Sequence, residues 1–410
     1  MVESQLNIPE GWEGKELGSL YLEKRKSKFK VSDATNYGGI PFYTSGDAVL
    51  EHNVIQTDGE NIFLATGGIA NVKFYNGKVA YSTDTYVIVG KENISTQFLY
   101  FKILDQLYYI NTNYFQGSGL KHLQKKDLRK HLFALPKTEI EQTTIANILS
   151  KCDEAIANTV ALIAKYTRIK TGLMQDLLTK GIDENGNIRS EQTHEFKDSP
   201  LGRIPKEWGC LSIKDIAERL RSGVTPKGGS DVYEKEGILL IRSQNVYSYG
   251  FKLDDVAYIN EEINNRMLGS QLKEFDVLLN ITGASIGRAT YVPEGFPRAN
   301  VNQHVCAIRL KKADVNNAIF LSSYLNSIYG QNQIYQNIAG SNREGINYTQ
   351  IKEINVPFFN NDFELIKFSE MITKSNERIN SEMKKLSKLQ LLKTGLMQDL
   401  LTGKVRVNNL

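Results

Sequence analysis

The sequence predicts an α+β protein in which two similar globular domains are separated by two long helices that form an antiparallel coiled-coil rod. Three observations predict this fold. The nine-residue run TGLMQDLLT occurs twice, and apolar residues with heptad spacing precede each copy. Short β-branched runs broken by Gly, Asn and Asp fill the rest of each half. Together they indicate a chain with a pseudo-two-fold internal repeat.

The repeat is identical over nine positions, Thr171–Thr179 and Thr394–Thr402, at an offset of 223 residues. Nine identities in nine positions indicate an internal duplication rather than a coincidence. A weaker echo opens each half, because Ile-Pro-x-x-Trp stands at both Ile8 and Ile204. Each half therefore reads as a mixed domain followed by a helix.

The first long helix is expected over Thr143–Leu178, where Gly181 is a typical stop, and the second over about Phe363–Leu401. At 1.5 Å per residue, a helix of about 36 residues spans roughly 54 Å. Helices of this length at matching places are expected to pack against each other, although each could instead pack on its own domain. The residues expected in helix packing or partner docking share the heptad spacing: Ile145, Leu149, Ile156, Ile163, Leu173, Leu177, Phe368, Ile372, Ile379, Leu386, Leu396 and Leu400.

The globular parts are expected to be twisted sheets with short helices at Gln97–Leu107 and Val315–Tyr329. The polar, turn-rich stretch after the first long helix reads as a linker. The predicted organisation is a first domain at 1–137, a central spacer helix at 138–181, a linker at 182–200, a second domain at 201–358 and a C-terminal spacer helix at 359–410.

Composition excludes several classes of protein. The chain has 410 residues, of which 41% are hydrophobic and 23% charged, as in ordinary globular domains. Its three cysteines and five histidines show no spacing typical of a disulfide framework or a metal site. Phosphate-binding glycine motifs and recognisable catalytic sets are also missing from the sequence. We therefore expect no catalysis, cofactor or metal in this chain. With no recognisable leader or membrane span, we expect it in the cytoplasm.

Nucleic acid is the partner that the polar residues favour. Two basic runs, Lys24–Lys30 and Lys121–His131, can neutralise phosphates, although each could also be a solvated face. Arg, Asn and Gln in glycine-flanked loops can bond two base-edge atoms at once, although the same residues are common in ordinary turns. The candidate DNA-binding residues are Lys24, Lys26, Lys28, Thr44, Ser45, Thr66, Lys73, Ser118 and Lys121 in the first half, and Thr225, Arg242, Gln244, Asn245, Thr282, Ser285, Arg288, Asn302, Gln303, Ser341, Asn342 and Arg343 in the second.

Several local motifs stand out along the chain: the two Ile-Pro-x-x-Trp openings, Ser222-Gly-Val-Thr-Pro226, Asp276-Val-Leu-Leu-Asn-Ile-Thr-Gly-Ala-Ser-Ile-Gly287 followed by Asn302-Gln303, Glu141-Gln142 at the entry of the central helix, and the tail Leu400-Leu-Thr-Gly-Lys-Val-Arg-Val407. No single motif is decisive, but their order together with the duplication is specific. With these motifs the chain resembles, over essentially its whole length, the specificity subunits of type I restriction–modification systems.

The resemblance implies that each globular domain is a target recognition domain that reads one half of a bipartite site in double-stranded DNA. The helices would act as a spacer and as the docking surface for two modification subunits. Those subunits would use S-adenosylmethionine to methylate adenine, and restriction subunits would add an ATP- and Mg-dependent motor and nuclease. The chain itself would be non-catalytic.

Two departures from a perfect repeat bear on this expectation. The first half lacks the Ser-Gly-x-Thr-Pro pattern, so the two half-sites should differ in sequence. The second helix has Glu364-Leu365 where the first has Glu141-Gln142, so the two ends need not grip a partner equally. Two other interpretations stay open. A self-contained DNA-modifying enzyme predicts turnover by the chain alone, and a protein-binding adaptor predicts no affinity for DNA.

Overall fold

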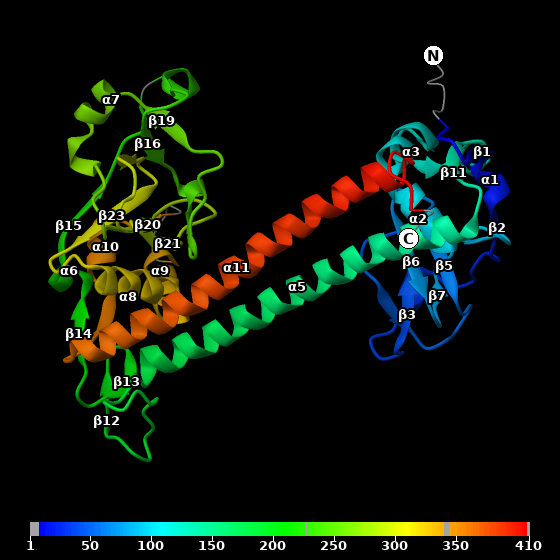
Figure 1. Ribbon diagram of the computed structural model, residues 1–410. Coiled ribbons are helices and arrows are strands. Elements are labelled where there is room, and N and C mark those ends of the chain that lie inside the picture. Colours follow the sequence, from blue (N-terminus) through cyan, green and yellow to red (C-terminus); the bar gives the residue numbers. More distant parts are fainter. Residues whose placement is uncertain (1–7, 227, 340–344, 408–410) are drawn as a thin grey trace. The chain divides into compact units, whose positions relative to one another are not determined.

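The computed structural model describes residues 8–226, 228–339 and 345–407, and it divides the chain into two compact units. Unit 1 contains Met1–Val160 together with Lys384–Leu410, and unit 2 contains Ala161–Met383. Both units combine small sheets with helices (Figure 1). The predicted α+β class with a repeated domain is confirmed.

Unit 1 is built around a four-stranded antiparallel sheet in the order β2-β8-β5-β6. The central strand β5 (Glu60–Ala65) buries Ile62, Phe63 and Leu64, as expected of a strand covered on both faces. A second sheet has the order β4-β3-β7, with β3 and β7 parallel, and β1 pairs with β11. The other elements are β1 Trp12–Glu16, α1 Leu17–Leu20, β2 Tyr21–Glu23, β3 Ile40–Tyr43, β4 Leu50–His52, β6 Val72–Asn76, β7 Ala80–Tyr81, β8 Thr85–Gly90, α2 Thr96–Asp105, α3 Leu107–Tyr114, β9 Phe115–Gln116, β10 His122–Leu123, α4 Lys125–Arg129 and β11 Leu132–Pro136.

Unit 2 repeats the order and direction of strands in these three sheets, whereas the pair of β9 and β10 is found in unit 1. Its four-stranded sheet has the order β15-β23-β20-β21, its three-stranded sheet has the order β19-β16-β22 with β16 and β22 parallel, and β14 pairs with β24. The hairpins β12–β13 and β17–β18 are added. The elements are β12 Phe196–Ser199, β13 Gly202–Pro205, β14 Gly209–Ser212, α6 Ile213–Ile216, β15 Ala217–Ser222, β16 Ile238–Ile241, β17 Val246–Tyr247, β18 Gly250–Phe251, β19 Ala257–Ile259, α7 Glu261–Arg266, β20 Val277–Asn280, β21 Ala289–Tyr291, β22 Ala299–Val301, β23 Val305–Leu310, α8 Val315–Asn326, α9 Ile328–Ala339, α10 Tyr348–Lys352 and β24 Asn355–Phe358.

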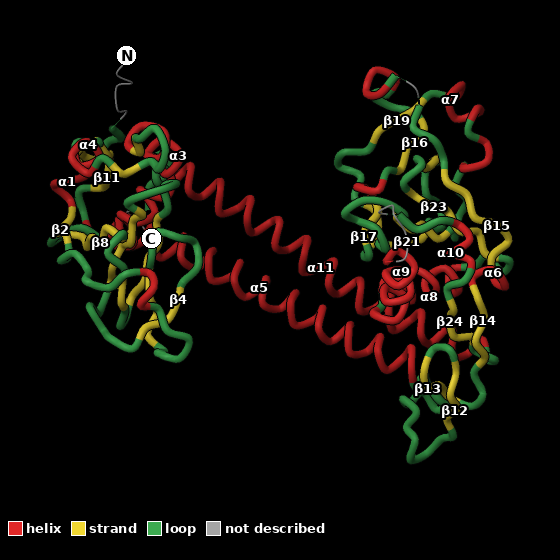
Figure 2. The backbone as a smooth tube through the Cα atoms, turned by 180° about the vertical axis from the view of Figure 1, so that it is seen from behind, coloured by secondary structure: helices red, strands yellow, loops and turns green. Residues whose placement is uncertain are grey.

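The two predicted short helices are present, but each is followed directly by another helix. The first expected helix corresponds to α2, after which α3 begins, and the second corresponds to α8, after which α9 begins. Ser95 caps α2 and Asp314 caps α8, since each side chain accepts a backbone N–H of the first turn. Figure 2 shows α3, α8 and α9 beside the strands of their own units.

The long helices are α5 (Glu139–Thr179) and α11 (Asp362–Leu400). The start of α5 precedes the expected Thr143, because the Thr138 hydroxyl accepts the backbone N–H of Glu141 at 3.4 Å and begins the helix before the apolar periodicity does. Gly181 and Gly403, with φ of 66° and 71°, follow the two helix ends in the left-handed conformation that favours glycine.

Each long helix begins in one unit and ends in the core of the other. The last turns of α5 contribute Met174, Leu177 and Leu178 to the core of unit 2. The last turn of α11 and the residue after it contribute Leu400 and Leu401 to the core of unit 1. The repeated TGLMQDLLT segment is therefore an anchor that fixes the end of a helix in a globular core.

The predicted packing positions fall into two groups. Those near the helix ends are buried or packed on the domain cores: Ile145, Leu149, Leu396 and Leu400 in unit 1, and Leu173, Leu177, Phe368 and Ile372 in unit 2. Those in the middle of the helices, Ile156, Ile163, Ile379 and Leu386, are half-buried.

Contacts join α5 and α11 in both units, and those of unit 1 run in antiparallel order. In unit 1, Asp153 pairs with Lys393 at 2.5 Å, and Glu141 pairs with Arg406 just beyond the end of α11. In unit 2, the Arg378 guanidinium lies 4.4 Å from the Tyr166 ring centre. Side chains of the two helices thus meet in both units.

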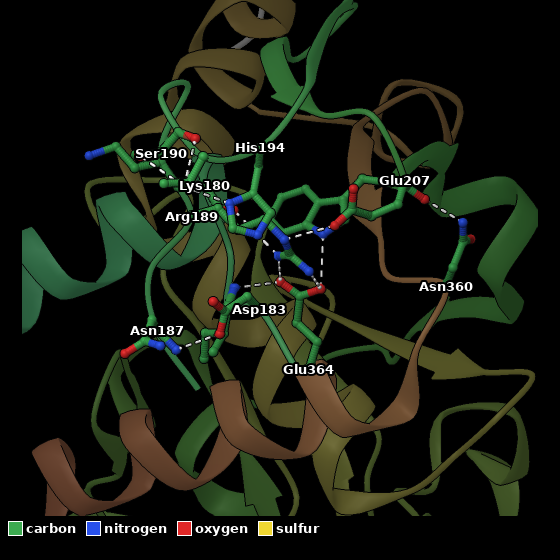
Figure 3. A network of polar contacts seen from close by, with 12 residues as sticks. Lys180, Asp183, Asn187, Arg189, Ser190, His194, Glu207, Asn360 and Glu364 are labelled. Carbon is green, nitrogen blue, oxygen red and sulfur yellow. Dashed lines mark hydrogen bonds and ion pairs between the residues drawn. The ribbon is translucent and has the colours of Figure 1, made fainter. Parts of the chain in front are cut away.

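A buried polar junction holds the start of α11 in unit 2 (Figure 3). The Glu364 carboxylate accepts hydrogen bonds from Arg189 at 2.6 and 3.2 Å, from the Ile182 backbone at 2.7 Å and from the Trp208 indole at 3.0 Å. Glu207 lies 2.8 Å from Arg189 on the opposite side. The junction joins the end of α5, the beginning of α11 and the Ile-Pro-x-x-Trp segment.

Unit 1 has a corresponding junction at Glu141, which the 223-residue offset aligns with Glu364. Arg406 donates to both oxygens of the Glu141 carboxylate at 2.6 and 2.7 Å, and it also bonds the backbone oxygen of Glu10. Lys102, nearly buried, donates to the Leu401 carbonyl at 2.9 Å, close to the end of α11. Cations there are favourable because the last carbonyls of a helix lack partners within it.

Candidate nucleic-acid interface

Five loops of unit 1, which are far apart in sequence, meet beside the ends of its strands. We call residues 24–29, 44–46, 66–68, 82–84 and 118–121 the unit 1 loop cluster. Backbone hydrogen bonds join these loops. The N–H of Thr83 donates to the oxygen of Phe29 at 2.7 Å, and the N–H of Ser82 donates to the oxygen of Tyr43 at 2.9 Å. The N–H of Thr66 donates to the oxygen of Asp84 at 3.2 Å. The fifth loop joins through Gly68, which donates to the Lys121 oxygen at 2.8 Å. These strand-end loops are where a rigid sheet can present variable side chains.

Short side chains fasten the unit 1 loop cluster. The hydroxyls of Ser45 and Thr66 both donate to the backbone oxygen of Asp84, and the Ser45 oxygen accepts the Thr66 N–H at 3.2 Å. Lys73 on β6 donates to the backbone oxygens of Thr44, at 3.4 Å, and Gly46. Burial lowers the pKa of the Lys73 ammonium, which the nearby Asp47 partly opposes. These four candidate DNA-binding residues, Thr44, Ser45, Thr66 and Lys73, therefore hold the loops of the cluster together.

The basic residues of unit 1 form its solvent-facing part. Lys26, Lys28, Ser118 and Lys121 are exposed, and Lys24 is half-buried. Their ammonium groups lie on two loops of one cluster, although 93 residues separate Lys28 from Lys121. A polyanion that approaches this cluster would meet cations from both.

Unit 2 forms the same cluster with different side chains. The unit 2 loop cluster comprises residues 223–225, 242–245, 282–288 and 302–304, and residues 345–346 lie beside it. Asn302 donates its backbone N–H to Ile241 at 3.1 Å, and Gly223 donates to Asn302 at 3.2 Å. Ile281 donates to His304, and Ile346 donates to Ile281, both at 3.0 Å. The predicted Ser341, Asn342 and Arg343 lie outside the described residues.

One exposed carboxylate organises the second loop of the unit 2 cluster. Asp255 accepts from the Gln244 amide at 2.7 Å, and its backbone oxygen accepts from Arg242 at 3.0 Å. The Asn245 amide is buried and donates to the oxygens of Lys252 and Asp255. Asn245 thus acts within the loop, whereas Arg242 and Gln244 lie beside a carboxylate that a nucleic acid could displace.

The remaining predicted residues of unit 2 divide in the same way. Asn302 is buried, and its side-chain oxygen accepts the His304 N–H at 3.1 Å. Three pairs link the other loops: Thr225 with Gln303, Thr282 with His304 at 2.6 Å, and Ser285 with the Asn280 amide at 3.0 Å. Gln303 and Arg288 are exposed. They present an amide and a guanidinium to solvent at the surface of the cluster.

The sequence analysis did not select the acceptors that hold these loops in place. Asp84 accepts through its backbone oxygen, and Asp255 accepts through both its carboxylate and its backbone oxygen. Asn300 is fully buried and donates to Asn264 and to the Met267 backbone, both at 3.1 Å. Their partners are distant in sequence, so no local pattern points to them. In the structure β7 matches β22, which aligns Ser82–Asp84 with Asn302–His304.

The described residues contain no group of three or more His, Cys, Asp or Glu side chains arranged to hold a metal. None of their helices has the length and apolar character required to cross a membrane.

Comparison with known proteins identifies the family. The family model described as "Type I restriction modification DNA specificity domain" matches residues 9–166 and again 205–360. The type I restriction enzyme MjaVIII specificity subunit of Methanocaldococcus jannaschii is 24% identical over 428 residues, which cover 99% of this chain and 95% of that protein. The Escherichia coli EcoDI specificity subunit is 28% identical over 234 residues, which cover 52% of this chain and 51% of that protein.

A solved structure shares the fold. The type I restriction–modification S subunit from M. genitalium superposes with a TM-score of 0.71 at 16% identity, covering 98% of this chain and 97% of that one. At that identity the superposition supports the fold alone. The family model, however, covers well over half of the chain and matches it once in each half. The chain belongs to the type I restriction–modification specificity family.

Proposed function

We propose that this chain is the non-catalytic subunit that recognises a bipartite target in double-stranded DNA and directs modification and restriction subunits to it. The observation that carries the proposal is the loop cluster, which occurs once in each unit, on corresponding strands and with different side chains. Ser82-Thr83-Asp84 in unit 1 takes the place of Asn302-Gln303-His304 in unit 2. Two loop clusters with the same backbone arrangement and different side chains suit the recognition of two half-sites that differ in sequence.

The chemistry of each cluster supports binding of a duplex. Exposed lysines of the unit 1 cluster can contact phosphates, which position a protein without reading sequence. Exposed Gln303 and Arg288 in unit 2 belong to the residue types that read base edges in the major groove. A chain that binds cellular DNA in this way would work in the cytoplasm.

The long helices would set the distance between the half-sites. A helix of 41 residues, such as α5, is about 60 Å long. Half-sites one turn of DNA apart are separated by about 34–36 Å, which lies within that length. We propose that the two helices act as the ruler that fixes the gap in the recognised sequence.

One exposed apolar patch on the long helices of each unit would dock a modification subunit. Leu391 and Leu392 on α11 in unit 1 are 74% and 52% exposed, and Ile169 on α5 in unit 2 is 54% exposed. The 223-residue offset aligns Ile169 with Leu392. We assign the docking to these residues because an exposed apolar side chain stands at the same position of both repeats. The bound modification subunits would bring S-adenosylmethionine and adenine methylation, and restriction subunits would bring ATP- and Mg-dependent translocation and cleavage.

Co-expression tests the proposal. The chain is expressed with a type I modification subunit in cells that lack other adenine methyltransferases, and methylated adenines are mapped across the genome. We expect one bipartite motif with a gap of fixed length, and none when either protein is omitted. Methylation at unrelated sequences, or methylation by the modification subunit alone, would contradict the proposal.

A further inference from the structure

Arg288 and Asn71 occupy the same position in the two repeated domains. In unit 2 the backbone N–H of Asn280 donates to the oxygen of Arg288 at 2.8 Å, just before Leu279 pairs with Ala289 in the ladder. In unit 1 Ala65 donates to Asn71 at 3.0 Å, just before Leu64 pairs with Val72. Asn71 and Arg288 therefore stand at equivalent points, directly before β6 and β21.

The surroundings of Arg288 differ from those of four other arginines of unit 2. Its guanidinium carbon lies 5.0 Å from the Tyr247 ring centre, and Tyr247 lies 5.1 Å from the ring of Tyr249. Within the described ranges, no carboxylate forms an ion pair with Arg288. By contrast, Arg242, Arg266, Arg298 and Arg309 each pair with a carboxylate.

This arrangement orients a cation without neutralising it. Stacking on an aromatic ring restricts the guanidinium plane, so less conformational entropy is lost when it binds. The loop that carries Arg288 is itself fixed, because Arg288 donates its N–H to Ser285 at 3.1 Å and the Asn280 amide bonds both Ser285 and Ser243. A rigid, exposed and uncompensated guanidinium fork matches the two acceptors, O6 and N7, of guanine.

We infer that Arg288 is the residue that reads a guanine in the half-site bound by unit 2. The inference rests on the proposed function. Asn71, which stands at the equivalent position, belongs to the residue type that pairs with adenine, and its amide donates to Asp47 at 2.6 Å. The shared position thus carries a different base-reading group in each half, which is what two unequal half-sites require.

A selection experiment tests this assignment. The full chain in complex with a modification subunit is incubated with a randomised double-stranded DNA library, and the bound fraction is sequenced. Arg288→Ala should reduce the preference for guanine at one position of one half-site by roughly tenfold or more, because a bidentate pair contributes that much discrimination. Arg288→Asn, which introduces the residue of unit 1, should shift the preference at that position to adenine.

Three further variants separate base reading from a general charge effect. Arg298→Ala removes an exposed arginine that pairs with Glu261 and should leave the motif unchanged. Tyr247→Phe keeps the ring and should preserve the guanine preference, whereas Tyr247→Ala should weaken it.

The outcomes for the two proposals are distinct. If Arg288→Ala keeps every base preference, or weakens binding equally for all sequences as a phosphate contact would, the assignment of Arg288 is wrong while the bipartite motif of the wild type still supports the proposed function. If the wild type itself enriches no bipartite motif, both proposals fail.

Discussion

Replacing Glu364 with alanine should destabilise unit 2 far more than any surface ion pair could. The carboxylate is 5% exposed and accepts four hydrogen bonds, two of them from Arg189, which is 8% exposed. Without it the Arg189 cation keeps only Glu207, which is half exposed, and the Trp208 indole and the Ile182 amide lose their acceptor. Removing one partner of a buried ion pair typically costs about 3–5 kcal/mol, because the other charge stays buried. We expect a loss of about 4 kcal/mol in the free energy of unfolding of unit 2.

The two tryptophans make this loss measurable. Trp12 lies in unit 1 and Trp208 in unit 2, so in a Trp12→Phe background indole fluorescence during urea unfolding reports unit 2. Arg203→Ala is the matched control, since its pair with Glu191 is about half exposed and should contribute less than 1 kcal/mol. If Glu364→Ala shifts the unfolding free energy no more than Arg203→Ala does, the junction does not hold unit 2 together.

Three further predictions follow from the same structure. Burial lowers the pKa of Lys102 to about 8, against 10.5 for an unburied lysine. Between pH 8 and 10.5 the unfolded chain therefore binds more protons at Lys102 than the folded chain does. This difference should raise the free energy of unfolding of unit 1 by about 3 kcal/mol over that range, as measured by urea unfolding at each pH. The variant Lys102→Met should lack the gain. Deleting one heptad from each long helix, residues 157–163 and 383–389, shortens each helix by about 10 Å. The gap in the methylated motif should then shrink by up to about three base pairs, while both half-site sequences are kept. An unchanged gap would exclude the helices as the element that sets this distance. Leu392→Glu and Ile169→Glu should each remove one modification subunit from the purified complex, and the double variant both, as measured by light scattering; undiminished mass would exclude these patches as docking sites.

The sequence was sufficient for the features that repeat locally. Apolar residues three and four apart located both long helices, and the second was placed within one residue at each end. The duplication predicted two similar domains, and the strand orders of the two units agree. The DNA candidates that the structure describes fall into the two loop clusters, except Lys73, which lies on β6 and contacts the unit 1 cluster. Their contact with DNA stays a prediction.

Features that depend on distant partners were not predictable. Arg189 lies in the polar stretch that reads as a linker, yet Glu364, 175 residues away, makes it part of a buried junction. The leucines of TGLMQDLLT have the spacing of a helix seam, but nothing in that spacing shows that Leu177 and Leu400 enter globular cores. Likewise, Asn245 and Arg288 have residue types equally suited to reading bases, and only their partners in the structure separate an internal amide from an exposed guanidinium.

Exchanging the domains one at a time tests the central claim most directly. Residues 1–137 or residues 201–358 are replaced by the corresponding domain of another family member, and methylated adenines are mapped for each chimaera beside the wild type. If each domain reads its own half-site, each exchange should change one half of the bipartite motif and leave the other half intact. If either exchange alters both halves, or neither, the two domains are not independent readers of DNA and the account is contradicted.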